Sequence, residues 1–402
     1  MNILLVCRDF FRGGGASSRW NSLVKYLSKK HKIYVLTNSP RKISESGIGN
    51  SNIRMFHCPI NPKFSNIPFL SLANIISLIF FTHRSLFKTN MDVIVVTIPE
   101  LEEGIAGTIV SKSFGSPLIM EVRDLIVEDH VEAVYSMLPK LFRKFIKVLF
   151  ERTFLWVIDS SDKVVTVTST LKECLVSEGA NVPIDVIPNG ADTEIFRPVG
   201  PNEKLKLKRK IGLENDFLIL YAGAMGVAYY PMHVVFRAIK IVTQSFPNVR
   251  LVLCGSLGKN TKELMKSLGD YVEYFGQMDR ERVAGLMRTC DVGVITMDER
   301  MSTFCALTTK FFEYLASGMP VVAACPKGGE LDRLITEQQV GYAVSSGDYK
   351  AMAESIVQLL KDNQKHQIFA RNGIDMVASN FTREKQAETY DKVLLEIEKA
   401  KR

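Results

Sequence analysis

Residues 308–322 read Thr308-Thr309-Lys310-Phe311-Phe312-Glu313-Tyr314-Leu315-Ala316-Ser317-Gly318-Met319-Pro320-Val321-Val322. The pattern predicts a helix over residues 309–316, a glycine stop at Gly318, and a buried strand that begins at Val321. A helix that leads directly into a buried strand is the building unit of a parallel α/β sheet. This stretch therefore places the chain in the α/β fold class.

The same alternation of apolar runs and helical stretches extends through the whole chain. Strands are predicted in the first half at 3–7, 33–37, 53–57, 93–97, 118–122, 164–167 and 185–187. Strands are predicted in the second half at 217–221, 249–254, 272–275, 292–295, 321–323 and 342–344. Helical patterns lie between most of them, for example at 139–159 and 280–289. The two halves therefore repeat one architecture.

Proline and glycine concentrate between the two halves, at Pro188-Asn189-Gly190, Arg197-Pro198 and Gly200-Pro201. A basic stretch over residues 204–210 follows them. This density of proline and glycine is typical of a linker.

The linker separates two Rossmann-like domains, which we predict over residues 1–196 and 197–381. Residues 382–402 are predicted to form one amphipathic helix that packs back on the N-terminal domain. Open parallel sheets bind ligands beyond the carboxyl ends of their strands. We therefore expect the two domains to face each other across a central cleft.

The composition is that of a globular protein in a reducing compartment. The chain has 402 residues, 46% of them apolar, which is too long for one ordinary core. The seven cysteines include no C-x-x-C pair, so we interpret them as buried thiols rather than disulfides or a zinc site. The net charge of +8 allows anionic partners, but no basic run interleaved with aromatics indicates nucleic-acid binding.

No secretory signal or transmembrane helix is expected from the sequence. Met1-Asn2 has no basic flank, and the first apolar run is too short for a signal peptide. The most apolar run, residues 67–81, is shorter than the roughly 20 residues of a spanning helix. We therefore expect a cytoplasmic protein.

A basic amphipathic pattern between residues 138 and 149 leaves two interpretations open. Leucine and phenylalanine recur with helical spacing, and four basic residues lie mostly away from them. The helix either lies on an anionic lipid surface, as a peripheral membrane protein would, or packs in the core with a solvated basic face. The residues are Leu138, Leu141, Phe142, Phe145 and Leu149, with Lys140, Arg143, Lys144 and Lys147.

Two glycine-containing loops follow the first strand of each half. The first contains Gly13, Gly14 and Gly15, and the second contains Gly223 and Gly226. Glycine lets the backbone approach a ligand, and the helix N-terminus that follows favours an anion. The alternative is a plain tight turn in each place.

The helix that begins at Thr309 carries the strongest candidates for ligand contact. Lys310 and Glu313 are one turn apart near its start. A lysine can bind a phosphate, and a carboxylate can accept both hydroxyls of a ribose. The alternative is a solvated ion pair, which is common at helix surfaces.

Acidic residues and histidines elsewhere give weaker signals. Glu100, Glu102 and Glu103 follow a strand end where acceptor groups could lie, and exposed acids at a helix start are the alternative. Asp298 and Glu299 follow another strand. His130 and His233 have no metal-ligand spacing, so no metal site is predicted.

Several longer motifs resemble glycosyltransferase family 4. Residues Val186-Ile187-Pro188-Asn189-Gly190-Ala191-Asp192-Thr193-Glu194-Ile195-Phe196-Arg197-Pro198 are similar to its inter-domain signature, and Lys310 to Val322 is similar to its donor-site helix. The stretches 276–295, 328–330, 341–342 and 347–348 fall in the family's order. Glu121-Val122-Arg123-Asp124-Leu125 resembles the branch of bacterial fucosaminyltransferases of surface-polysaccharide assembly.

The resemblance implies the GT-B fold and retaining, metal-independent transfer from a nucleoside-diphosphate-sugar donor to a hydroxyl acceptor, without a cofactor. It implies that the N-terminal domain binds a glycan or lipid-linked glycan acceptor, such as a polyprenyl-diphosphate-linked saccharide. It places Gly223, Gly226, Thr309, Lys310 and Glu313 at the donor. A GT-B-fold nucleotide-sugar epimerase and a non-catalytic nucleotide-sugar-binding module remain alternatives.

The chain departs from the family pattern at several positions. Cys305 stands where most members have a first glutamate, and Ala224 and Tyr229 stand near the usual basic pair. Lys310 and the Gly223–Gly226 loop are expected to replace that pair.

Arg123 and Asp124 are the catalytic candidates. Arg123 stands where many family members have a histidine. We predict that its guanidinium stabilises the departing diphosphate. The alternatives are a structural Arg123 paired with Glu121 or Glu128, and a helix-capping Asp124.

Overall fold

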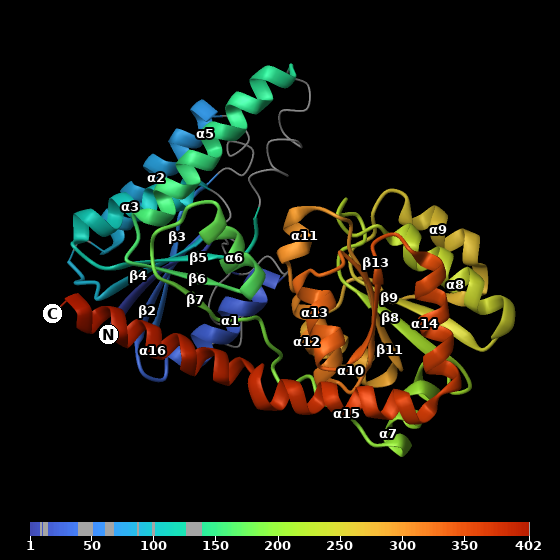
Figure 1. The fold of residues 1–402 in the computed structure, drawn as a ribbon. Helices are drawn as coiled ribbons and strands as arrows, with labels where there is room; N and C mark the ends of the chain where they lie inside the picture. The colour runs from blue at the N-terminus through green and yellow to red at the C-terminus, as the bar shows by residue number, and fades with distance from the viewer. Residues whose placement is uncertain are drawn as a thin grey trace. The chain divides into compact units, whose positions relative to one another are not determined.

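The computed structural model describes residues 1–8, 10, 15–38, 51–60, 68–86, 88–98, 101–125 and 139–401, without the side chains of 15–18 and 68–70. It divides into two compact units (Figure 1). Unit 1 consists of Met1–Pro188 and Glu384–Arg402, and unit 2 consists of Asn189–Arg383. Each unit is a parallel sheet covered by helices, as the alternation of apolar runs predicts.

The sheet of unit 1 has seven strands in the order β3-β2-β1-β4-β5-β6-β7. All its pairings are parallel. The strands are β1 Asn2–Val6, β2 Lys32–Thr37, β3 Ile53–His57, β4 Val93–Ile98, β5 Leu118–Val122, β6 Lys163–Thr166 and β7 Ile184–Val186. The described helices are α1 Gly15–Leu27, α2 Pro68–Leu86, α3 Leu101–Phe114, α5 Lys140–Asp159, α6 Ser169–Ser177 and α16 Arg383–Lys401.

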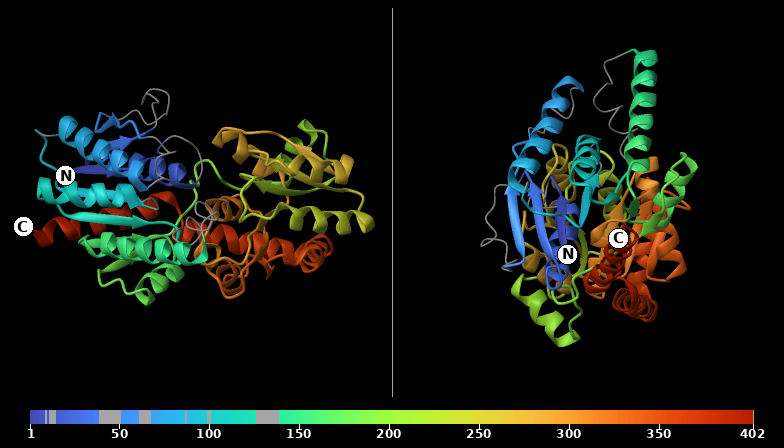
Figure 2. Two further views of the ribbon diagram at one scale, coloured as in Figure 1. Left: turned by 90° about the horizontal axis from the view of Figure 1, so that it is seen from above. Right: turned by 90° about the vertical axis from the view of Figure 1, so that its left-hand side faces the viewer.

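One face of this sheet carries α2, α3 and α5 side by side, with α3 in the middle (Figure 2, left). Glycines permit this packing, because a Cβ on Gly107 would overlap Val96 of β4 and a Cβ on Gly104 would meet Val157 of α5. The C-terminal helix α16 completes the core of unit 1 together with α1. Tyr390 of α16 is fully buried, and its ring lies 5.2 Å edge-on from that of Trp20.

The sheet of unit 2 has six strands in the order β10-β9-β8-β11-β12-β13, again all parallel. The strands are β8 Phe217–Ala222, β9 Val249–Cys254, β10 Val272–Tyr274, β11 Val292–Thr296, β12 Val321–Cys325 and β13 Gly341–Ser345. The helices are α7 Pro201–Lys210, α8 Met232–Ser245, α9 Thr261–Leu268, α10 Arg280–Thr289, α11 Met301–Cys305, α12 Thr309–Ala316, α13 Glu330–Glu337, α14 Tyr349–Lys361 and α15 Asn363–Asn380, with a 3-10 turn at Gly269–Tyr271.

The basic stretch that follows the predicted linker is a helix rather than irregular chain. Pro201 begins α7, where its missing N–H costs nothing. Lys204 and Lys208 bind the carboxylate of Asp291 at 2.8 Å and 2.6 Å. Burial opposes ionisation there, but the two ammonium groups hold the pKa of Asp291 below its usual range. These ion pairs attach α7 to the start of β11 in unit 2.

Each sheet has one point where the strand order reverses direction, which is where open α/β sheets bind ligands. The reversal lies between β1 and β4 in unit 1, and between β8 and β11 in unit 2. Among the described helices, none is both long and apolar enough to cross a membrane.

Candidate functional site

The reversal point of unit 2 is built on glycines that let two loops touch. The Gly223 amide donates to the Cys254 carbonyl at 2.8 Å, and a Cβ on Gly255 would overlap the Gly223 carbonyl oxygen. A Cβ on Gly226 would lie 2.8 Å from the Cα of Gly258. Because Gly223 has φ +138 and Gly255 φ +131, both adopt backbone conformations that favour glycine. The Gly223–Gly226 loop is therefore a close-packed backbone surface beside the end of β8.

Helix α12 is seated against this loop by its Tyr314 side chain. The Tyr314 ring is fully buried over Gly293 of β11, where any Cβ would overlap it. The backbone N–H of Ala222, at the end of β8, donates to the Tyr314 hydroxyl at 2.7 Å. Gly318, with φ +78, ends the helix as the sequence predicts. These contacts fix the first turn of α12 at the reversal point.

Lys310, in that first turn, holds its ammonium group against two aromatic rings. Its Nζ lies 4.1 Å from the ring centroid of Tyr221 and 5.0 Å from that of Tyr230. A Cβ on Gly223 would lie 3.0 Å from the same Nζ, so a larger residue there would crowd the ammonium. Burial lowers the pKa of Lys310 to about 7, and nearby Glu313 opposes this only in part. The surrounding protein therefore balances the positive charge of the Lys310 ammonium only in part.

Glu313 lies one turn further along α12 and is mostly buried. Its Oε1 is 3.4 Å from the Nη2 of Arg280, which is a long contact for an ion pair. Burial raises the pKa of Glu313, and the charges of Arg280, Arg383 and Lys310 oppose that rise. The alternative of a solvated Lys310–Glu313 pair does not fit Glu313, because its side chain is only 12% exposed and its carboxylate contacts Arg280.

The start of α12 also carries two hydroxyls that the described part of the chain does not satisfy. Thr308 is the N-cap residue, but its side chain makes no capping hydrogen bond. The Oγ1 atoms of Thr308 and Thr309 are buried and have no hydrogen-bond partner among the described residues. Unused donors at a helix N-terminus beside a cation form an arrangement suited to an anion.

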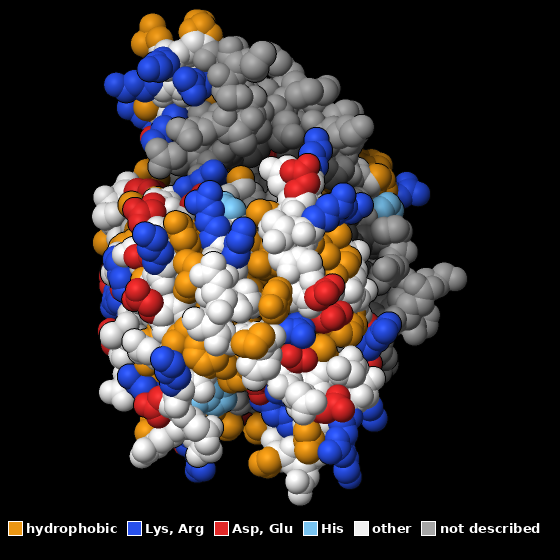
Figure 3. All heavy atoms as spheres, turned by 90° about the vertical axis from the view of Figure 1, so that its right-hand side faces the viewer, with side chains coloured by type: hydrophobic (Ala, Val, Ile, Leu, Met, Phe, Trp, Pro, Cys, Tyr) orange, Lys and Arg blue, Asp and Glu red, His pale blue; other side chains and the backbone are white. Residues whose placement is uncertain are grey.

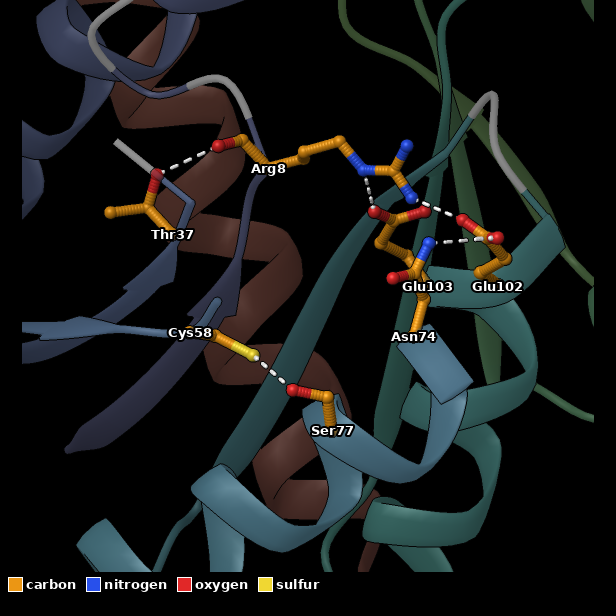
Figure 4. Close-up of polar contacts among 7 residues, drawn as sticks. All are labelled: Arg8, Thr37, Cys58, Asn74, Ser77, Glu102 and Glu103. Atoms are coloured by element: carbon orange, nitrogen blue, oxygen red, sulfur yellow. Dashed lines mark hydrogen bonds and ion pairs between the residues drawn. The ribbon is translucent and has the colours of Figure 1, made fainter. Parts of the chain in front are cut away.

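The reversal point of unit 1 is occupied by the protein's own ion pairs (Figure 4). Arg8, which follows β1, binds Glu102 and Glu103 at the start of α3. Asn74 of α2 donates to Glu102 at 3.2 Å. The expectation that the acids at this helix start are exposed is therefore wrong for Glu102 and Glu103, which are both buried.

Arg123 follows β5 at the same edge of unit 1. Glu121, one of its two predicted structural partners, instead binds Arg19 at 2.7 Å and accepts a hydrogen bond from the Trp20 indole. The Nε of Arg123 is buried and has no hydrogen-bond partner among the described residues. The other suggested partner, Glu128, lies outside the described residues.

Several other predicted site residues are exposed or lie outside the described residues. Gly13 and Gly14 lie outside the described residues, as do Glu100, His130 and Leu138, and Gly15 is the first residue of α1. Asp124 is exposed, in the irregular chain after β5. His233 is exposed on α8. No cluster of three or more metal-ligand side chains occurs within the described ranges.

The loop after β11 lies close to the Gly223–Gly226 loop. The Asp298 amide donates to the Tyr229 carbonyl at 3.1 Å, and the Asp298 carboxylate binds Arg300 at 2.8 Å. Glu299 is exposed, and Cys305 is buried at the end of α11. Sequence reasoning missed Tyr221 and Tyr230 as site residues, because only the fold brings their rings to Lys310.

Two family models match the two halves of the chain. Residues 13–195 match the family described as Glycosyltransferase Family 4, and residues 216–362 match Glycosyl transferases group 1. The chain is 29% identical over 238 residues to D-inositol 3-phosphate glycosyltransferase of Stackebrandtia nassauensis, a match that takes in 55% of this chain and 51% of the relative. It is 25% identical over 292 residues to the capsular polysaccharide biosynthesis glycosyltransferase CapM of Staphylococcus aureus, covering 69% of this chain and 70% of CapM.

Among solved structures, HepE of Anabaena in complex with UDP and glucose superposes with a TM-score of 0.74. The sequence identity is 18%, and the superposition covers 98% of this chain and all of HepE. This likeness shows the fold alone. The matched part of this chain spans about half the length of the D-inositol relative, at 51%.

Two parallel Rossmann-like sheets of these strand orders define the GT-B fold, which confirms the predicted fold class. The two family matches together take in well over half of the sequence. The chain belongs to family 4 of the glycosyltransferases.

Proposed function

We propose that the protein is a retaining glycosyltransferase and that unit 2 binds its nucleoside-diphosphate-sugar donor. The observation that carries the proposal is the position of Lys310. Its ammonium lies over two tyrosine rings, at the point of the sheet where open α/β folds bind ligands. A diphosphate there would supply the negative charge that the surrounding protein lacks.

The neighbouring groups match the remaining parts of such a donor. The Thr308 and Thr309 hydroxyls and the helix N-terminus that they flank can donate to phosphate oxygens. The Gly223–Gly226 loop lets the donor approach the backbone closely. Within the described part of the chain, the Glu313 carboxylate contacts Arg280 at 3.4 Å, which is long for an ion pair, so it can accept the two hydroxyls of a ribose.

The N-terminal domain, with Arg123 and Asp124 after β5, is proposed to bind the acceptor and to assist departure of the diphosphate. The buried Nε of Arg123 has no hydrogen-bond partner among the described residues, which supports a contact with a substrate oxygen. Asp124 is exposed beside it. The capsular-polysaccharide relative supports a glycan or lipid-linked glycan acceptor, and Glu121 to Leu125 supports the fucosaminyltransferase-like branch.

The experiment is a panel of nucleotide sugars tested by thermal unfolding, followed by turnover assays with the best ligand. A donor that binds only the folded state raises the melting temperature. We expect one or a few nucleotide sugars to do so, and Lys310→Met to remove the shift. Failure of every nucleotide sugar would overturn the proposal, whereas binding without nucleotide release toward any acceptor would indicate a non-catalytic module.

A further inference from the structure

The first half of α5 is apolar but has no buried side chain. Among residues 140–153 every side chain is exposed or partly exposed, and Leu141, Phe142 and Phe145 are 79%, 62% and 68% exposed. The second half differs, because Phe154 and Val157 are buried, and Val157 packs against α3. The helix is therefore anchored at one end and presents large apolar side chains at the other.

A second apolar stripe lies on α2 in the same layer of helices. Leu72, Ile76 and Phe80 are four residues apart, so they share one face of the helix, and each is more than half exposed. Helix α3 lies between α2 and α5 and exposes Ile109. We call the three helices' exposed apolar side chains, together with the basic residues of α5, the lipid-facing surface.

The charges on this surface are mostly positive, and the exception among residues 140–153 is Glu151, which forms a 3.8 Å ion pair with Lys147. Residues 140–150 contain Lys140, Arg143, Lys144 and Lys147 and no acidic residue. Helix α2 also contains no aspartate or glutamate, and the two glutamates of α3 are buried against Arg8. Hydrophobic and basic side chains occur together at the free end of α5, at the top of Figure 3.

We propose that the lipid-facing surface binds the interface of an anionic lipid bilayer, with the apolar side chains inserted among the lipids and the lysines and arginines at the headgroups. Apolar residues flanked by cations on a helix of low overall hydrophobicity are the combination that binds such interfaces. The charge pattern disfavours a second copy of this chain as the occupant, because a two-fold contact would set the same cations against each other. This binding does not depend on the sugar donor.

The experiment is co-sedimentation of the full chain with vesicles at low salt. Vesicles of phosphatidylglycerol mixed with phosphatidylcholine serve as the anionic probe, and pure phosphatidylcholine serves as the neutral one. We expect the protein to sediment with the anionic vesicles and much less with the neutral ones, and we expect added salt to weaken binding.

Two combined variants separate the contributions of charge and apolar contact. Lys140→Gln, Arg143→Gln and Lys144→Gln in combination should lower the partition coefficient by roughly a hundredfold, because each basic residue near an anionic surface contributes about fivefold. Phe142→Ser combined with Phe145→Ser should lower it by about tenfold or more. Both sets are exposed or partly exposed, so circular dichroism should show an unchanged fold.

The matched control is the basic helix α7 of unit 2. Lys206→Gln, Arg209→Gln and Lys210→Gln remove the same charge from exposed positions on that helix and should leave sedimentation unchanged. The proposal is overturned if wild type does not sediment with anionic vesicles, if it sediments equally with neutral ones, or if the α7 variant loses as much binding. Wild-type dimers that become monomeric in the Phe142/Phe145 variant would instead identify the surface as an interface between copies.

Discussion

The reversal points of the two sheets occupy equivalent places in their folds but use their charges differently. In unit 1, Arg8 at the end of β1 is bound by Glu102 and Glu103, and all three side chains are buried. In unit 2, Lys310 beside the end of β8 lies over the rings of Tyr221 and Tyr230. A guanidinium between two carboxylates is neutralised by the protein, whereas ring faces attract an ammonium without supplying a neutralising negative charge.

The difference indicates which of the two reversal points can bind an anion. Bringing an anion to Arg8 would require displacing carboxylates that already hold it. Bringing an anion to Lys310 relieves the cost of a buried charge, which the lowered pKa of Lys310 reports. Anion binding is therefore expected at the edge of unit 2, and structural ion pairing at the edge of unit 1.

The largest expected effect tests the structural role of charge in unit 1. Glu121→Gln removes the carboxylate that holds the fully buried Arg19 and should lower the free energy of unfolding by about 3–5 kcal/mol. Urea denaturation measures this. Glu396→Gln is the control, because the Glu396 contact with Lys163 is largely exposed and should contribute less than about 1 kcal/mol. Equal losses of stability in the two variants would show that the buried Arg19–Glu121 pair contributes no more than the Lys163–Glu396 pair.

The next effect concerns ligand contact in unit 2. Glu313→Gln should weaken nucleotide-sugar binding by about 1.5–3 kcal/mol, because a charged acceptor becomes a neutral one. Calorimetry measures the affinity, and Glu337→Gln, on the exposed face of α13, is the control. Unchanged donor affinity would remove Glu313 from the site.

Arg123 differs from Arg8 within unit 1, because its buried Nε has no hydrogen-bond partner among the described residues. Arg123→Ala should lower turnover by at least about tenfold, or about 1.4 kcal/mol of barrier, with a smaller change in donor affinity. Arg123→Lys should restore part of the rate, since it keeps the charge but not the planar fork. A folded Arg123→Ala protein with near-normal turnover contradicts the catalytic role.

The protonation of Lys310 predicts how donor affinity depends on pH. Burial lowers the pKa of Lys310 to about 7, so its ammonium is present below this pH and is lost above it. Because a diphosphate selects the protonated form, affinity for a nucleotide sugar should fall about tenfold between about pH 6 and about pH 8. Calorimetry at several pH values measures this, and a flat dependence would show that Lys310 does not bind the phosphates.

The smallest expected effect is that of metal removal. The described residues contain no cluster of metal-ligand side chains, and Lys310 with the start of α12 is positioned to carry the diphosphate charge. Turnover should therefore be unchanged in EDTA. Loss of activity on chelation, restored by magnesium or manganese, would show that a cation shares this role.

The sequence allows prediction of the strands and of the helix at the site, because both depend on local patterns. The runs at 53–57, 118–122 and 249–254 have the bounds observed for β3, β5 and β9. Gly318 ends α12 because a left-handed residue is needed there, which is a local requirement. Lys310 and Glu313 could be selected because they share one short helix.

Pairings between distant residues could not be predicted in the same way. Arg8 meets Glu103 across 95 residues of sequence, and Arg19 meets Glu121 across 102. No periodic signal marks such partners, since strand order decides which loops become neighbours. Helix α7 is not predicted from the sequence for a related reason: Lys204 and Lys208 are held by Asp291, which lies directly before β11 and far from them in the chain.

The location of Tyr390 against Trp20 has a consequence for the order in which the protein is made. Unit 1 is assembled from a segment synthesised before unit 2 and a segment synthesised after it, whereas unit 2 is one continuous segment between them. Domains usually complete themselves in order from the N-terminus. Here the second-synthesised unit has all its residues available first, and the nascent unit 1 must wait with the α16-binding face of its sheet uncovered until residues 384–401 emerge. A chain that stops before α16 would therefore lack part of the core of unit 1, the unit whose synthesis begins before that of unit 2.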